Sequence, residues 1–383
     1  MSSEKSRHVL GVFVFALCLV GVITIASGYG SNDAYPELAE IEAHGEWTLA
    51  QATDYFRTLA ETRSPSYAFE VLNRATLPTS VNVHGVAHVI GYALYAKEGL
   101  AGMEQCTEDF RYACSHALVI SGFVEHGAAA LSDIVDACEA APGGPGAYEA
   151  CMHGLGHGLL AYADYNLPQA LRTCRTAADF GPPREGNGHR LTDPYEECVG
   201  GVVMEMGQGA HDETVHALMA PRYAPEDNPL MPCTSDEMPE DARDACYLNV
   251  TQRLLVSVGA VASIPEPELY APAMRLCRGA PREYQAACYG GFGKEFSFYA
   301  IQRDTQDPTR VSDAALGDVW EWCGYAEDAE GVRRCGQVAL DSFFWAGRNG
   351  LFTPYAFCRH APEAHAESCN LWLSENIDHF SYN

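Results

Sequence analysis

The fold of this chain is decided by a ten-residue stretch that reads Tyr148-Glu149-Ala150-Cys151-Met152-His153-Gly154-Leu155-Gly156-His157. The frame around its cysteine returns as Tyr195-Glu196-Glu197-Cys198-Val199-Gly200-Gly201 and as Tyr284-Gln285-Ala286-Ala287-Cys288-Tyr289-Gly290-Gly291. A looser copy reads Arg111-Tyr112-Ala113-Cys114-Ser115-His116-Ala117. Such self-similarity predicts one structural unit that is repeated along the chain.

Alignment on these cysteines gives about eight copies, and in the first copy Asn82 stands where the others have cysteine. Further copies begin at Cys246, Cys335 and Cys369. The copies begin about 32 to 48 residues apart, which is typical of helical hairpins. We therefore expect an all-α fold of tandem helical-hairpin repeats over residues 81–383, arranged as a curved solenoid or a closed α/α toroid. Residues 33–80 contain amphipathic stretches and are expected to form an N-terminal helical cap.

Fourteen of the fifteen cysteines, all except Cys18, follow one another along the chain as close pairs. The segments between partners contain proline and glycine, which are typical of loops, whereas the segments between pairs have helical patterns. An even number of cysteines in an exported chain indicates disulfides. We expect seven local ones: Cys106 with Cys114, Cys138 with Cys151, Cys174 with Cys198, Cys233 with Cys246, Cys277 with Cys288, Cys323 with Cys335 and Cys358 with Cys369.

Residues 1–28 have the pattern of an export signal. Lys5 and Arg7 precede an apolar run of 18 residues from Val9 to Ala26, which is just long enough to cross a bilayer as a helix. An uncleaved signal-anchor with its N-terminus inside the cell is favoured, and it makes the protein a single-pass, extracytoplasmic membrane protein. The alternative is a signal peptide cleaved near Ala26-Ser27-Gly28, which would release a secreted protein.

The charge balance indicates which partners the surface can attract. The chain has 51 acidic and 24 basic residues and a formal net charge of −27. This balance argues against nucleic-acid binding, because few basic side chains are left to neutralise phosphates. Cations are the natural small partners, although excess surface carboxylate also serves solubility.

Five histidines fall on only two positions of the repeat. His84, His116 and His153 follow the aligned position by two residues, whereas His88 and His157 follow it by six. Later copies have other residues there, so the repeat does not need these histidines for packing. Because residues four apart share one helix face, each pair can present two imidazoles to one cation.

A transition-metal site requires more than one such pair. Imidazole suits zinc, copper or iron, and a complete site has three or four ligands. Glu149 lies one turn before His153 on the same helix face. Glu205 reaches the row of histidines from successive copies only if its helix is distorted or leans toward that row. Glycine at the second position of both His-x-x-x-His motifs distinguishes them from the zinc-protease pattern. The predicted metal ligands are His84, His88, His116, His153, His157, Glu149 and Glu205.

The sequence thus predicts an exported, membrane-anchored metal-binding protein. It leaves open whether the metal serves catalysis, for which redox chemistry or hydrolysis would be the reaction classes. The alternative is an extracytoplasmic repeat scaffold that binds a protein or peptide and whose histidines are structural. Adjacent helices lie about 8 to 10 Å apart. Curvature therefore decides whether the five rings meet at one centre or form separate, weaker sites.

Overall fold

The computed structural model describes residues 35–78, 80–181, 193–208, 227–261, 264–301, 311–345 and 352–380. The described residues are mostly helical, and none of them forms a β-strand, which confirms the predicted all-α class. The predicted membrane segment, Val9 to Ala26, lies outside the described residues, and its anchoring role stays a prediction.

The chain divides into two compact units. One comprises residues 1–45 with 74–76 and contains α2 (Glu37–His44). The other comprises residues 46–73 and 77–383, and it contains all seven disulfides and the five histidines. It opens with α3 (Leu49–Thr62) and α4 (Pro65–Arg74), whose last residue belongs to the first unit. The expected cap over 33–80 stays a prediction.

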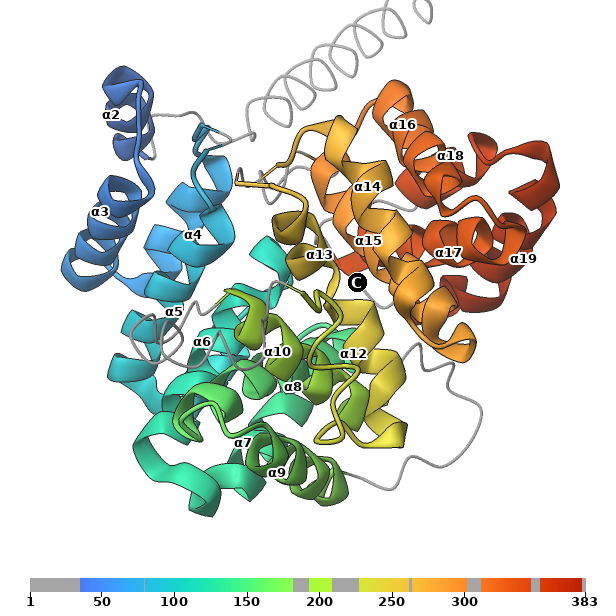
Figure 1. Ribbon diagram of the computed structural model, residues 1–383. Coiled ribbons are helices and arrows are strands. Elements are labelled where there is room, and N and C mark those ends of the chain that lie inside the picture. The colour runs from blue at the N-terminus through green and yellow to red at the C-terminus, as the bar shows by residue number, and fades with distance from the viewer. Residues whose placement is uncertain are drawn as a thin grey trace, which may run out of the picture. The chain divides into compact units, whose positions relative to one another are not determined.

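A series of eight helices runs through the second unit, and each packs against the next in chain order; their labels can be followed in Figure 1. Most side chains of α6 and α15 are buried, as expected for helices surrounded by other helices. The series consists of α5 (Val83–Glu98), α6 (Asp109–His126), α8 (Gly144–Tyr162), α10 (Pro194–Gln208), α12 (Arg243–Asn249), α15 (Arg282–Ala300), α17 (Ala329–Trp345) and α19 (Glu363–Phe380).

Shorter helices and 3-10 turns connect the members of this series. The helices are α7 (Leu131–Glu139), α9 (Leu167–Phe180), α13 (Thr251–Ser257), α14 (Tyr270–Arg275), α16 (Asp313–Cys323) and α18 (Phe352–Arg359). The turns are Gly99–Gln105, Gly127–Ala130, Glu240–Ala242, Pro267–Leu269, Leu276–Gly279 and Gly324–Ala326. Each connecting segment that carries a cysteine is tied by a disulfide to the long helix that follows it.

Seven disulfides join the cysteines in the local pairing expected from the sequence. The partners are 8 to 24 residues apart in the chain. Closing loops of this size stabilises a fold by about 2.5 to 3.5 kcal/mol per disulfide in the chain-entropy description. Seven disulfides also point to an oxidising environment, which is extracytoplasmic or secreted. The bonds join Cys106 with Cys114, Cys138 with Cys151, Cys174 with Cys198, Cys233 with Cys246, Cys277 with Cys288, Cys323 with Cys335 and Cys358 with Cys369.

The last cysteine of each pair lies within a helix of the central series, as the alignment of the copies requires. For the later copies, Cys246 lies on α12, Cys335 on α17 and Cys369 on α19. All three are buried, at 0%, 0% and 3% exposure. In these copies the cysteine therefore packs in the core, and its disulfide attaches the preceding segment to the central helix. That the copies are equivalent hairpins of one repeat stays a prediction.

One described stretch, Asp109–Glu139, is long and apolar enough to cross a membrane by length and composition. It comprises α6, a 3-10 turn and α7, and 56% of its apolar window is buried inside the protein. A core helix of a water-soluble fold has the same properties. The stretch is therefore weak evidence for a membrane span.

Helices α6, α8 and α10 approach one another at glycines, where a side chain would not fit. A Cβ atom on Gly154 would lie 2.7 Å from Cα of His116, and one on Gly156 would overlap the carbonyl oxygen of Cys198. Gly85, at the same motif position as Gly154, has no such neighbour, since its nearest atom is 3.7 Å away on Asn82. Close backbone approach therefore explains Gly154 and Gly156 but not Gly85.

These two motif glycines provide a matched test of the packing. We expect Gly154→Ala to lower the free energy of unfolding by about 1 to 3 kcal/mol, because α6 and α8 must move apart. Gly85→Ala should leave it unchanged or raise it by up to about 1 kcal/mol, because alanine favours helix. Urea unfolding of the disulfide-intact chain measures both. Equal effects of the two substitutions would contradict the close approach at Gly154.

Candidate metal centre

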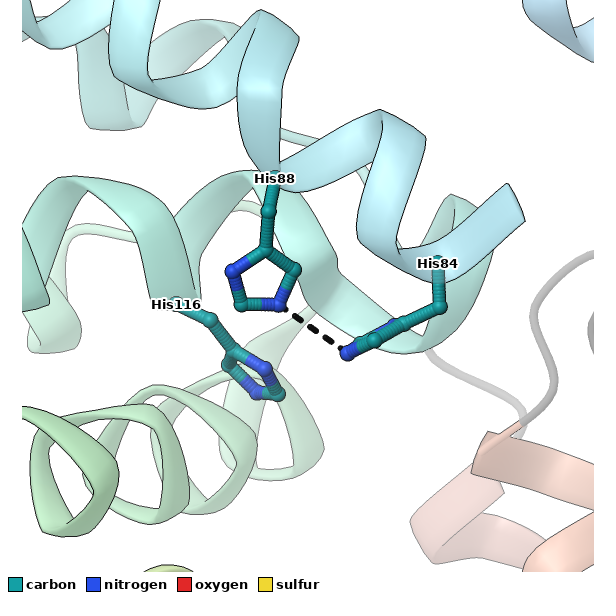
Figure 2. A group of neighbouring side chains, drawn as sticks. All are labelled: His84, His88 and His116. Carbon is teal, nitrogen blue, oxygen red and sulfur yellow. Dashed lines mark hydrogen bonds between the residues drawn. The ribbon is translucent and has the colours of Figure 1, made fainter. Parts of the chain in front are cut away.

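Three histidines from two neighbouring helices form a compact group. His84 and His88 lie one turn apart on α5, and His116 comes from α6, with all three rings turned toward one another (Figure 2). One ligand nitrogen from each lies within 4.8 Å of the others. His88 and His116 are only 7% and 5% exposed, so the group is shielded from water. This group could hold a metal ion.

The start of α5 places its two histidines. The side chain of Asn82 accepts a hydrogen bond of 3.1 Å from the backbone N–H of Gly85 and caps the helix. The helix therefore begins at Val83, and His84 stands in its first turn. At this position the other copies of the repeat have a cysteine, whereas the first copy has Asn82, which caps the helix.

A strained turn at the start of α6 orients His84. Phe110, Arg111 and Tyr112 have φ values of 55°, 54° and 58°, in the left-handed region that costs non-glycine residues about 1 to 2 kcal/mol each. The carbonyl oxygen of Phe110 lies 2.6 Å from Nδ1 of His84. A carbonyl can only accept, so we assign the ring proton to Nδ1 and the lone pair to Nε2.

The remaining nitrogen of His84 faces its neighbour on the same helix. Nε2 of His84 and Nε2 of His88 lie 3.0 Å apart, and the His88 nitrogen donates in this pair. Two nitrogens bound to one tetrahedral ion at about 2.0 to 2.1 Å lie about 3.3 Å apart. An ion would therefore take the place of the shared proton, with His88 changing to its Nδ1–H tautomer. The Phe110 carbonyl is the kind of second partner that metal-bound histidines have.

His116 lies between the two histidine pairs. In the part of the chain that the structure describes, neither of its ring nitrogens has a hydrogen-bond partner. A buried polar group without a hydrogen-bond partner lowers the stability of a fold by about 1 to 3 kcal/mol. Its ring centroid lies 5.6 Å from that of His84, 5.7 Å from His88, 5.9 Å from His153 and 6.3 Å from His157. The five rings are thus contiguous.

The second pair is held by carboxylates of α10. The ring centroids of His153 and His157 lie 5.2 Å apart on α8. Nδ1 of His153 is 3.5 Å from Oε2 of Glu197, and Nδ1 of His157 is 3.1 Å from Oε2 of Glu205. Glu205 also accepts a hydrogen bond of 2.9 Å from the Tyr165 hydroxyl. Both rings therefore turn Nε2 away from the carboxylates.

Of the predicted ligands, the compact group contains only those on α5 and α6. Glu205 meets the second pair because α10 leans against α8, where a Cβ on Gly201 would overlap the carbonyl oxygen of His153. Glu149 is fully buried on α8. The pKa of Tyr112 is raised mainly by burial, with smaller contributions from Glu108 and Glu149. For His153, His157, Glu149 and Glu205, metal ligation stays a prediction.

Sequence reasoning missed Glu197, although a signal for it was present. Glu197 and Glu205 are two helical turns apart with Gly201 midway between them, so they share the face that packs on α8. The preceding copy has the same four-residue spacing at Glu149, His153 and His157. The rule that residues four apart share one helix face, applied to carboxylates as well as to histidines, identifies Glu197 as a neighbour of His153.

Two histidines of the compact group stay neutral at ordinary pH. The pKa of His84 is well below its usual value because of burial, the Arg111 charge and the neighbouring rings. The pKa of His116 is lowered by burial and by the other histidines, with Arg111 a smaller cause. Neutral imidazole is the form that binds metals. Arg111 also stacks on Phe298 of α15, with its guanidinium carbon 4.3 Å from the ring centroid.

Glu197 connects the histidines with a cavity of about 340 Å³. Nearby, burial and the charge of Glu197 raise the pKa of the Asp341 carboxyl to about 7. Charged side chains dominate the cavity lining: Glu196, Glu197, Asp244, Glu283, Glu330, Arg333 and Arg334. A cation or a small polar molecule in this cavity would lie beside the carboxylate that contacts His153.

Comparison with known proteins does not extend this picture. No family model, no curated protein and no solved structure matches the chain. The geometry and chemistry of the donor set are therefore the basis for the functional argument.

Acidification should destabilise the metal-free protein from about pH 6.5 downward. Because the pKa of His116 is lowered in the folded state, the unfolded chain binds more protons below the ordinary value of about 6.5, and acid favours unfolding. Each histidine with such a lowered pKa reduces the free energy of unfolding by about 1.4 kcal/mol per pH unit. This holds between its folded-state and unfolded-state pKa values. Urea unfolding with chelator present, from about pH 7.5 to about pH 5, measures the slope.

His116→Leu is the matched control for this pH dependence. Asp341, whose pKa is raised, titrates in the same range with the opposite sign, so the difference between wild type and variant is the quantity to compare. The variant should lose stability less steeply on acidification. Identical slopes would show that His116 is not held neutral by the fold.

Proposed function

We propose that this is an extracytoplasmic metalloprotein whose ion is held by His84, His88 and His116. The observation that carries the proposal is the convergence of three ligand nitrogens within 4.8 Å around a buried His116 ring without hydrogen-bond partners. A set of imidazole nitrogens suits zinc, copper or iron, in contrast to the oxygen ligands of magnesium or calcium. The donor set does not choose among these three metals.

Three protein ligands leave a position open on a four-coordinate ion. Structural zinc sites are usually closed by four protein ligands, whereas catalytic sites keep one position for water or substrate. The seven disulfides stabilise this fold, in contrast to small domains whose folding depends on a structural metal. These points support an ion that acts on a bound molecule, in redox or hydrolytic chemistry.

The open position is supported by the surroundings of the site. The His-Gly-x-x-His motifs contain no general base, but Glu197 and Glu205 on α10 reach the neighbouring histidine pair. Glu197 also lines the cavity of about 340 Å³, so a small molecule in this cavity would lie beside the carboxylate that contacts His153. We assign these carboxylates to positioning His153 and His157 and to favouring cations near the centre.

We further propose that the protein is exported and anchored through residues 1–28, with a body built from repeats. The chain-order packing of eight helices and the recurrence of one disulfide in each of the last seven units support the repeat. The contact of Arg111 on α6 with Phe298 on α15 supports strong curvature of this series. Without such curvature, the histidines of the first and third copies would lie too far apart to meet at one centre.

Metal analysis of the full chain, produced with its disulfides and without a histidine tag, tests the proposed site. We expect bound zinc, copper or iron to survive desalting, and His84→Ala to weaken zinc binding at least tenfold, since even an outer partner of a ligand contributes about 10- to 100-fold. His126→Ala is the control, because His126 is exposed on the same helix as His116. Equilibrium dialysis with zinc gives the affinities.

The scaffold alternative gives the opposite result. If the histidines are only structural, the wild-type chain binds no more zinc than the His84→Ala variant, and both retain the same helical content. That outcome would reject the metal site and favour a protein or peptide partner.

A further inference from the structure

We propose that the centre holds two metal ions and that His116 bridges them through its two ring nitrogens. One ion is ligated by His84, His88 and one nitrogen of His116. The second is ligated by the other nitrogen of His116 with His153 and His157. This inference rests on the proposed function and adds a second ion to it.

The first reason is the isolation of His116. A single ion uses one nitrogen of an imidazole, and the other nitrogen then needs a hydrogen-bond partner when the ring is buried. His116 is 5% exposed, and in the described part of the chain neither nitrogen has a partner. The rings of His84, His153 and His157, by contrast, each have an oxygen beside one nitrogen. A ring with two ligand positions and no hydrogen bonds is suited to bridge two ions.

The second reason is spacing. Two imidazoles on one ion, each bound at about 2.0 to 2.1 Å, have ring centres roughly 4.5 to 6 Å apart. The first triad has centroid separations of 4.6, 5.6 and 5.7 Å. The second triad has separations of 5.2, 5.9 and 6.3 Å, of which only the last exceeds the range, and by a small margin. Both triads therefore have ring spacings compatible with a shared ion, and in the first triad the ligand nitrogens also lie within 4.8 Å of one another.

The third reason is the common orientation of the outer rings. Nδ1 of His84 faces the Phe110 carbonyl, while Nδ1 of His153 and of His157 face the carboxylates of Glu197 and Glu205. An oxygen on one ring nitrogen fixes the tautomer and leaves the other nitrogen for a metal. The same arrangement on both sides of His116 supports an ion on each side.

The fourth reason is charge balance. Two divalent ions joined by one imidazole ring lie about 6 Å apart and repel each other. When the second ion binds, His116 gives its one N–H proton to solvent and becomes an imidazolate anion. Glu197 and Glu205 contribute two further negative charges beside the second triad. These anions offset the repulsion between the ions, and Arg111 lies on the side of the first triad.

This separation restricts the chemistry of the pair. Two-metal hydrolases hold their ions about 3.5 to 4 Å apart, so that one oxygen is shared by both. At about 6 Å a single water or hydroxide cannot bridge the ions. Each ion would therefore keep its own open position, and the two would communicate through the His116 ring.

Copper(II) loading of the full, disulfide-intact chain tests the bridge. We expect two copper ions per chain after desalting, with an electron paramagnetic resonance signal well below that of two isolated ions, because the imidazolate couples their spins. The double variant His153→Ala/His157→Ala should hold one copper with a full, uncoupled signal. His126→Ala should behave as wild type, and Glu205→Gln should weaken the second ion about 10- to 100-fold.

The outcomes separate this inference from the proposed function. One copper per wild-type chain overturns the bridge and leaves the His84, His88 and His116 site in place. No bound copper and no bound zinc overturns both. Two copper ions with twice the signal of one isolated ion also overturns the bridge. Should the double variant fail to fold, the coupling measured in the wild-type chain decides alone.

Discussion

The close approach of α6, α8 and α10 is the constraint on which the centre depends. At Gly154 the backbone of α8 comes so near to His116 that a methyl group would lie 2.7 Å from its Cα. At Gly156 and Gly201 the backbones of α8 and α10 meet in the same way. These contacts hold the His116 ring of α6 beside the His153 and His157 rings of α8, with ring centroids 5.9 and 6.3 Å apart. Close packing at these glycines is thus what brings the second histidine pair next to the group on α5 and α6.

The same close packing requires support elsewhere in the fold. Left-handed backbone at Phe110 and Arg111 is unfavourable by itself, and it persists only where the surroundings determine it. The disulfide from Cys106 to Cys114 closes a loop around this turn, and Arg111 is held against Phe298. The turn in return directs the Phe110 carbonyl to His84. Strain, disulfide and ligand orientation therefore belong to one local arrangement.

The sequence predicted those features that depend on neighbours along the chain. Cysteine spacing gave the all-α class and the local disulfides, and four-residue spacing put His84 with His88 and His153 with His157. It could not give the contacts that depend on curvature and helix crossing. These include the position of His116 between the pairs and the contact of Glu197 with His153. Gly85 shows the converse, since it has the same motif position as Gly154 but makes no close contact in the fold.

A cluster that resists protons can still accept a metal ion. Protonation places a full charge on one ring, where burial, Arg111 and the other imidazoles oppose it, and this keeps His84 and His116 neutral. A metal ion instead draws on several lone pairs at once, so the imidazoles that oppose protonation of one another become ligands, whereas Arg111 opposes both kinds of cation. The carboxylates on α10 then reduce the remaining positive charge. The clustered imidazoles that make the site poor for protons are therefore the groups that make it suitable for a metal.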